Sequence, residues 1–265
     1  MHLGRALMAC DLNPAYLGYW PSARRAWREI VGVEPLLVLI ADEKDVPEAL
    51  KSDPCVVTFS PLPGIHTALQ AQCIRLLYPA VVETEDAVVI SDVDLYPLRR
   101  SYFVDPLRKL DYCFFVSYRD VRLERRELPI AFNAAIPKTW ADLFGVATLD
   151  DVRAQLAEWT DGLEYHGGRA WAGWYRDQQI LYETLTGWRE APARWWAMDD
   201  DYTRYNRLDR LQVEREGGLE PARRRALLAQ AYSDYVCLFP CDEHREVNDL
   251  VLQLALTAAR RGSSP

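Results

Sequence analysis

Two aspartates follow a short apolar segment in the N-terminal half of the chain. Residues 87–90 read Ala-Val-Val-Ile, and Asp92 and Asp94 come directly after them. Because side chains alternate in an extended chain, Asp92 and Asp94 should point to one side while Val93 turns toward the core. Paired carboxylates at a strand end suit a hard divalent cation that also holds a diphosphate. A solvated acidic turn closed by Pro97 is the simpler alternative.

Two further clusters carry groups that can bind ligands. Cys237, Cys241 and His244 form a C-x3-C-x2-H cluster, but a closed structural zinc site needs four ligands and no fourth lies nearby in the sequence. Arg207, Asp209 and Arg210 form a compact charged set. A surface ion-pair network explains this set better than a contact with an acceptor or a phosphate.

Composition and charge limit the class of protein. The chain has 265 residues, 49% of them hydrophobic, which is enough for one large α/β domain or two small ones. Its net charge of −8 argues against bulk attraction to nucleic acid or to anionic membranes. No apolar run reaches membrane-spanning length. Six scattered cysteines are typical of a reduced protein, so we expect a cytoplasmic one without a membrane span.

Apolar runs and helical periodicity predict the elements that position these residues. No G-x-G-x-x-G follows the first strand, which disfavours a dinucleotide-binding fold. The order predicts an α/β fold with a mostly parallel, Rossmann-like central sheet flanked by helices, in a single domain over 1–259. We expect strands at 5–10, 36–41, 55–59, 87–91, 112–117 and 130–136, helices at 21–31, 65–78, 102–110, 138–144, 149–159, 174–185 and 247–259, a solvated loop at 119–127, a turn at 165–168 and a disordered tail at 260–265.

The segment before the aspartates strengthens the cation hypothesis. Residues 72–80 hold Arg75 and Pro79, then an acidic turn leads to the strand that ends in Asp92 and Asp94. This order resembles the central signature of GT-A-fold glycosyltransferases over about residues 70–100. The resemblance implies a GT-A-like domain, with a nucleotide-sugar-binding half at 1–100 and an acceptor-side half at 101–259. It implies that Mn²⁺ or Mg²⁺ joins Asp92 and Asp94 to the diphosphate of a UDP- or GDP-sugar.

The same resemblance assigns roles to residues elsewhere in the chain. His244 would be the third metal ligand, with His166 as the other candidate. Asp177 and Gln178 would be catalytic: Asp177 as a general base in an inverting enzyme, or either residue stabilising the sugar in a retaining enzyme. Trp171 and Trp174 could form an acceptor platform. The residues that would contact the nucleotide sugar are Cys10, Asp11, Asn13, Tyr16, Arg75, Ser91, Asp92, Val93 and Asn133.

Two other classes remain open at the level of sequence. A haloacid dehalogenase-like phosphatase also has a strand ending in D-x-D, with Asp92 as its nucleophile, but that motif normally lies near the N-terminus. A non-catalytic nucleotide- or carbohydrate-binding module would keep an aromatic pocket without needing the metal carboxylates. Sugar, base, acceptor, stereochemical outcome and oligomeric state stay undetermined.

Overall fold

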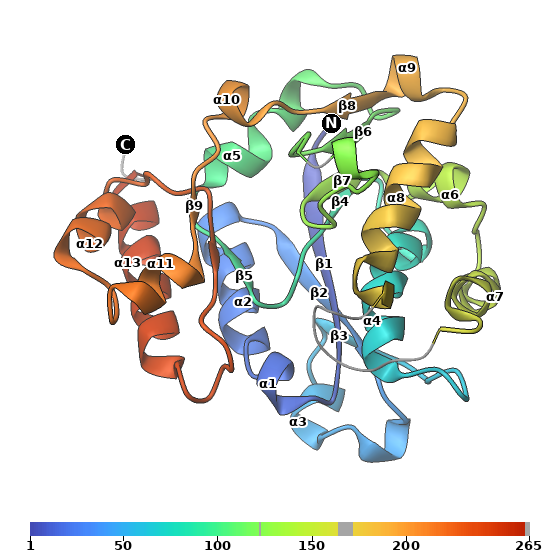
Figure 1. Cartoon of the computed structure of the whole chain (residues 1–265), viewed down its shortest axis with the longest axis horizontal. Helices are drawn as coiled ribbons and strands as arrows, with labels where there is room; N and C mark the ends of the chain where they lie inside the picture. The colour runs from blue at the N-terminus through green and yellow to red at the C-terminus, as the bar shows by residue number, and fades with distance from the viewer. Residues whose placement is uncertain (122, 164–171, 263–265) are drawn as a thin grey trace.

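A seven-stranded sheet forms the centre of the molecule (Figure 1). The computed structural model describes residues 1–121, 123–163 and 172–262. The strands lie in the spatial order β3-β2-β1-β4-β7-β6-β8, and only β7 runs antiparallel to its two neighbours. The predicted mostly parallel sheet is therefore confirmed. The bounds are β1 (Leu3–Asp11), β2 (Glu34–Ile40), β3 (Val56–Phe59), β4 (Ala87–Ile90), β6 (Phe115–Ser117), β7 (Asn133–Ala135) and β8 (Trp195–Ala197).

Helices cover both faces of this sheet because its strands are apolar on both sides. Along β1, Met8 packs in one buried cluster and Leu7 in the other. In Figure 1, α2 and α4 lie on opposite sides of β1. The larger helices are α2 (Trp20–Ala26), which continues as a π-helical turn at Trp27–Val31, α4 (Thr67–Leu77), α5 (Arg100–Val104), α6 (Pro137–Phe144), α7 (Leu149–Thr160), α8 (Arg176–Gly187), α11 (Arg210–Arg215), α12 (Pro221–Leu228) and α13 (Arg245–Gly262).

A second, three-stranded sheet brings the C-terminal part of the chain beside the turn that holds the aspartates. It consists of β5 (Leu95–Pro97), β10 (Asp234–Val236) and β9 (Arg207–Leu208), with β10 in the middle. Strand β10 is antiparallel to β5 and parallel to β9. The backbone N–H of Cys237 donates to the carbonyl of Asp94 over 2.9 Å, which ties the two segments together.

Short helical segments connect the main elements. They are α1 (Pro14–Leu17), α3 (Glu48–Lys51), α9 (Ala191–Arg194) and α10 (Asp200–Thr203), with 3-10 turns at Glu43–Asp45, Tyr78–Val81, Leu107–Lys109, Leu123–Arg125 and Ala172–Tyr175. The expected helix at 102–110 is instead α5 followed by one of these turns. The expected disordered tail at 260–265 is wrong for residues 260–262, which are helical and belong to α13. The helix extends beyond Ala258, the last buried residue among those described.

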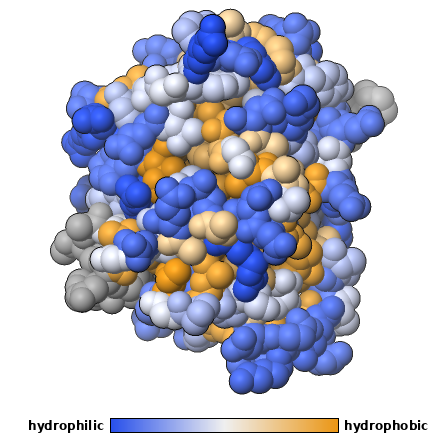
Figure 2. All heavy atoms as spheres, turned by 90° about the vertical axis from the view of Figure 1, so that its right-hand side faces the viewer, coloured by the Kyte–Doolittle hydropathy of each residue, from blue (hydrophilic) through white to orange (hydrophobic). Residues whose placement is uncertain are grey.

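The surface of the described chain is mixed in polarity. Figure 2 shows the face on the α7 side, where apolar residues are visible between hydrophilic ones. Among the described residues, no helix is both long and apolar enough to cross a membrane.

Candidate active site

The turn after β4 presents both aspartates to one cavity. Strand β4 ends at Ile90, and Asp92 and Asp94 lie in the connection to β5. Val93 between them is 3% exposed, because its side chain packs in the core cluster. The side chains of Asp92 and Asp94 remain 33% and 16% exposed. Val93 and Asp94 lie in a turn and not in the extended chain expected from the sequence, but both carboxylates line the same cavity.

Arg75 joins this turn to two helices. It is in the last turn of α4, which packs against β1 and α8, and it is 5% exposed. Its Nη1 group donates to Asp92, and its Nη2 group donates to Oδ2 of Asp177 over 3.0 Å. Burying an arginine is costly unless carboxylates pair with it, and here two do. One guanidinium thus holds α4, the β4–β5 turn and the start of α8 in a fixed relation.

Burial shifts the acid–base properties of two of the carboxyl groups. Burial raises the pKa of Asp177 to about 6, although Arg75 acts in the opposite direction. Burial and the nearby charge of Asp92 raise the pKa of Asp94 to about 6, and Arg210 partly offsets this. Perturbed carboxyl groups that meet in one cavity are typical of functional sites. A cation placed between the aspartates would favour their ionised forms.

The cavity contains most of the residues that the sequence singled out. Its volume is about 430 Å³. It lies between the carboxyl end of β1, helix α4, the β4–β5 turn, the start of α8 and the segment around β9, which is where open α/β sheets bind ligands. The residues predicted from the sequence that line it are Cys10, Asp11, Tyr16, Arg75, Asp92, Val93, Asp94, Trp174, Asp177 and Gln178.

The end of β1 forms one wall of the cavity. Asp11 accepts a hydrogen bond from the Thr67 hydroxyl over 2.7 Å, so its carboxylate is held at the start of α4. The ring of Tyr16 lies 5.0 Å from that of Phe239, measured between centroids. Burial raises the pKa of the Cys10 thiol, which therefore stays protonated. This wall offers an aromatic face and a fixed carboxylate.

Four predicted residues do not line this cavity, and three of them serve local structure. The Asn13 side chain caps α1 by accepting from the backbone N–H of Ala15. The Ser91 hydroxyl is buried and donates to the carbonyl of Asp92. Asn133 is buried in β7 and donates to the carbonyls of Pro129 and Ile130. Their predicted contacts with a nucleotide sugar are not supported by these positions.

The fourth of these residues is His244, the predicted third metal ligand. It lies just before α13 and is absent from the cavity lining. Within the described ranges, no group of three or more His, Cys, Asp or Glu side chains is arranged to hold a metal ion. The zinc alternative at Cys237 and Cys241 therefore gains no support. His166 and Trp171 lie outside the described residues.

Three charged residues of the cavity were assigned to the surface by the sequence. Arg207, Asp209 and Arg210 line it. The expected ion pairs are present, between Arg207 and Asp234 and between Arg210 and Asp94, but they border the cavity. The three residues follow Asp92 by more than a hundred residues, and only the pairing of β5, β10 and β9 brings them to the aspartates. Their compact spacing was the one available signal. Gln72, one turn before Arg75 in α4, also lines the cavity.

Comparison with known proteins clarifies the fold. No protein-family model matches the sequence, and no curated protein sequence does either. Among solved structures, the glycosyltransferase GlyE of Streptococcus pneumoniae TIGR4 matches with a TM-score of 0.53 and 13% identity, over 99% of this chain and 64% of that one. The chain has a GT-A-type glycosyltransferase fold. It spans a little less than two thirds of GlyE, and identity this low shows the fold alone.

Two other solved glycosyltransferases resemble the chain more distantly. The galactosyltransferase LgtC, in complex with donor and acceptor sugar analogues, has a TM-score of 0.49 and 13% identity, over 95% of each chain. Mouse xyloside xylosyltransferase 1 has a TM-score of 0.43 and 11% identity, over 88% of this chain and 97% of that one.

Proposed function

We propose that this chain transfers a sugar from a nucleoside-diphosphate sugar, a UDP- or GDP-sugar, to an acceptor hydroxyl. One observation carries the proposal: Asp92, Asp94, Arg75 and Asp177 meet in one cavity of a chain with a GT-A-type fold. GlyE, which shares the fold, is a glycosyltransferase. Which sugar, base and acceptor the chain uses stays open.

The chemistry of the two aspartates fits a Mn²⁺ or Mg²⁺ ion. Burial and, after it, the like charge of Asp92 raise the pKa of Asp94, and a bound cation would offset both effects. Mg²⁺ commonly takes one or two carboxylates and completes its shell with water and phosphate oxygens, so His244 is not required. Asp92 and Asp94 would hold the ion. When bound, it would supply Lewis-acid stabilisation of the charge on the departing diphosphate.

Asp177 is the residue best suited to act at the sugar. In the transfer, the bond from the anomeric carbon to the diphosphate oxygen breaks, a bond to the acceptor oxygen forms, and the acceptor proton leaves. A carboxyl group with a pKa of about 6 can accept that proton near neutral pH. The same carboxylate, with Gln178 beside it, also suits stabilisation of an electron-poor anomeric carbon. Arg75 positions it for either role.

The direct test is a screen of UDP- and GDP-sugars for release of the nucleoside diphosphate, with Mn²⁺ or with a chelator. We expect release with one donor, dependent on metal, and loss of release in Asp92→Asn and Asp94→Asn. Asp142→Asn is the matched control, because Asp142 is exposed, pairs with Lys138 on α6 and does not line the cavity. It should behave like the wild type.

The alternatives give different results in the same experiment. A phosphatase with Asp92 as nucleophile would release inorganic phosphate from simple phosphoesters. A binding module would bind nucleotide without turnover, and the asparagine variants would bind as the wild type does. If no nucleoside diphosphate binds or is released with any donor, the proposal is wrong.

A further inference from the structure

The cavity has a basic wall beside the two aspartates. Arg207, in β9, and Arg210, the first residue of α11, both line the cavity that holds Asp92 and Asp94. Nothing in the proposed roles of Arg75, Asp92, Asp94 and Asp177 uses these two arginines. Both are therefore available to bind another part of the donor or the acceptor.

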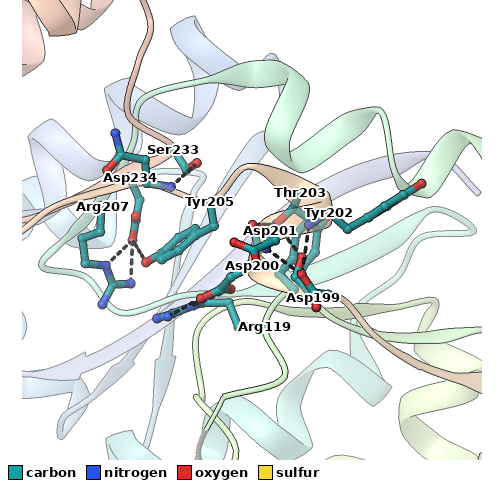
Figure 3. A network of polar contacts seen from close by, with 12 residues as sticks. Arg119, Asp199, Asp200, Asp201, Tyr202, Thr203, Tyr205, Arg207, Ser233 and Asp234 are labelled. Carbon is teal, nitrogen blue, oxygen red and sulfur yellow. Dashed lines mark hydrogen bonds and ion pairs between the residues drawn. The ribbon is translucent and has the colours of Figure 1, made fainter.

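Hydrogen bonds to Asp234 fix the position of the Arg207 guanidinium. Its Nε and Nη2 groups donate to Oδ2 of Asp234 over 2.9 and 2.6 Å. Asp234 is fully buried in β10, and the Tyr205 hydroxyl lies 3.4 Å from the same carboxylate oxygen. The Arg207 guanidinium is also 5.6 Å from the centre of the Tyr205 ring. Figure 3 shows Arg207 and Tyr205 converging on Asp234.

A second arginine, Arg119, also contacts the Tyr205 ring. The guanidinium of Arg119 lies 4.1 Å from the centre of the Tyr205 ring and forms a forked ion pair with Asp200. Figure 3 shows this second ion pair below Tyr205. Cation–π contacts of this kind fix the ring, and the ring in turn fixes Arg207. The arginine is thus preorganised before any ligand arrives.

Arg207 keeps donors available for a ligand. Its Nη1 group has no hydrogen-bond partner among the residues that the structure describes. Burial lowers the pKa of the guanidinium, but Asp234, Tyr205 and, farther away, Asp92 raise it above its ordinary value. The group therefore stays charged. A charged, rigid guanidinium with a free edge matches the geometry of phosphate oxygens.

Arg210 completes the wall with a looser arrangement. Asp209 caps α11 by accepting from the backbone N–H of Leu211 over 2.8 Å, which fixes where the helix begins. Arg210 then lies 3.7 Å from Oδ2 of Asp94, too far for a hydrogen bond. Its donors are free to turn toward an anion at little cost.

We propose that Arg207 and Arg210 bind the diphosphate group of the donor, beside the cation that Asp92 and Asp94 would hold. This inference rests on the proposed function. Two carboxylates already balance the two charges of a divalent cation, so a bound diphosphate would need further hydrogen-bond donors. Arg75 has both of its Nη groups on Asp92 and Asp177. Arg207 and Arg210 keep donors that could reach the diphosphate oxygens.

Inorganic pyrophosphate with Mg²⁺ is the probe, because it contains the proposed group without any base or sugar. Its affinity, and that of UDP and GDP, would be measured by calorimetry for the wild type, Arg207→Lys and Arg210→Gln. One charge-assisted hydrogen bond corresponds to about 10-fold or more in affinity. We expect at least about 10-fold weaker binding of pyrophosphate in each variant. Arg207→Lys keeps a positive charge beside Asp234, so it should fold.

Arg223→Gln is the matched control. Arg223 also forms a forked ion pair, with Glu216, and also contacts a tyrosine hydroxyl, that of Tyr232, but it does not line the cavity. It should leave pyrophosphate affinity unchanged. Arg210→Gln separates binding from folding, because its melting temperature should match that of the wild type while its pyrophosphate affinity falls.

The outcomes separate the two proposals. If wild type binds UDP or GDP, and both arginine variants bind pyrophosphate as tightly as it does, the inference is wrong and the proposed function stands. The same holds if the variants raise only the KM for the acceptor, since the arginines would then serve the acceptor. If wild type binds none of the diphosphates, the proposed function fails and the inference falls with it.

Discussion

Asp177 should destabilise the folded protein at neutral pH. Its pKa is raised from 3.8 to about 6, because burial disfavours the charged form more than Arg75 favours it. One pKa unit corresponds to about 1.4 kcal/mol, so ionised Asp177 costs about 3 kcal/mol of unfolding free energy at pH 7.5. We therefore expect Asp177→Asn, which keeps the size and one oxygen acceptor, to be more stable than the wild type.

The pH dependence gives the sign of this effect. Between pH 3.8 and about 6 the folded protein binds the Asp177 proton more tightly than the unfolded chain does. The unfolding free energy of the wild type therefore falls as the pH rises through this window, because Asp177 ionises. The asparagine variant has no group to ionise at this position, so it does not lose this part of the unfolding free energy. The difference between the two proteins should reach at most about 3 kcal/mol at pH 7.5 and approach zero near pH 4.

Urea unfolding followed by tryptophan fluorescence at pH 4, 5, 6 and 7.5 measures this difference, and the chain has nine tryptophans to report it. Asp151→Asn is the control of opposite sign. The N–H groups of Ala147 and Thr148 and the Thr148 hydroxyl lower the pKa of Asp151, so its ionised form stabilises the fold and the variant should be less stable at pH 7.5. An Asp177→Asn protein less stable than the wild type by the same amount at every pH would refute the reasoning.

Two further predictions concern the supports of the site. Arg75→Gln should lower the unfolding free energy by about 3 kcal/mol or more at pH 7.5, because it leaves Asp177 buried without its ion pair. The loss should be smaller at pH 5, where Asp177 takes up a proton. Urea titrations at the two pH values measure this, and an equal loss at both would contradict it. Thr148→Ala removes the side chain that accepts from the backbone N–H of Asp151 at the start of α7 and should cost about 1 kcal/mol. A lower melting temperature with unchanged nucleotide binding would confirm this prediction. An unchanged melting temperature would contradict the role of Thr148 as a helix cap.

The parallel core of the fold could be predicted from the sequence because its strands are continuous apolar runs. Strands β1, β2 and β4 are each buried over a run of apolar residues, 6–10 in β1, 37–40 in β2 and 87–90 in β4, and these runs stand out in the sequence. Helix α7 was equally clear, with Leu156 and Val152 on its buried side. These signals are local.

The second sheet could not be predicted because its strands are too short to show any periodicity. Strand β9 has two residues and β10 has three. They exist because backbone groups of β10 pair with β5 on one side and β9 on the other. This tertiary pairing leaves no trace in a single sequence, and Arg207 and Arg210 were assigned to the surface for that reason.

The residues of the candidate site also differ in whether a local sequence signal identifies them. The sequence placed Asp92, Asp94 and Arg75 together because a strand, a helix and the turn between them lie within twenty residues of one another, and all three line the cavity. Asp177, chosen from its place at the start of an aromatic helix, lines it too. Asn133, Ser91 and Asn13 do not line it, because a polar residue near a strand end can equally satisfy local backbone groups, as these three do.

The arginines explain how so many carboxylates coexist in and around one cavity. Asp92 and Asp177 share Arg75, Asp94 lies near Arg210, and Asp234 holds Arg207. Arg75 is buried and committed to its two partners, so it acts as a fixed part of the scaffold. Under the proposed function, the loose contact of Arg210 would be exchanged for a stronger one once a cation occupies Asp94 and a diphosphate arrives. A cation and a diphosphate would then bind best together, because each would remove the competing charge from the other's site.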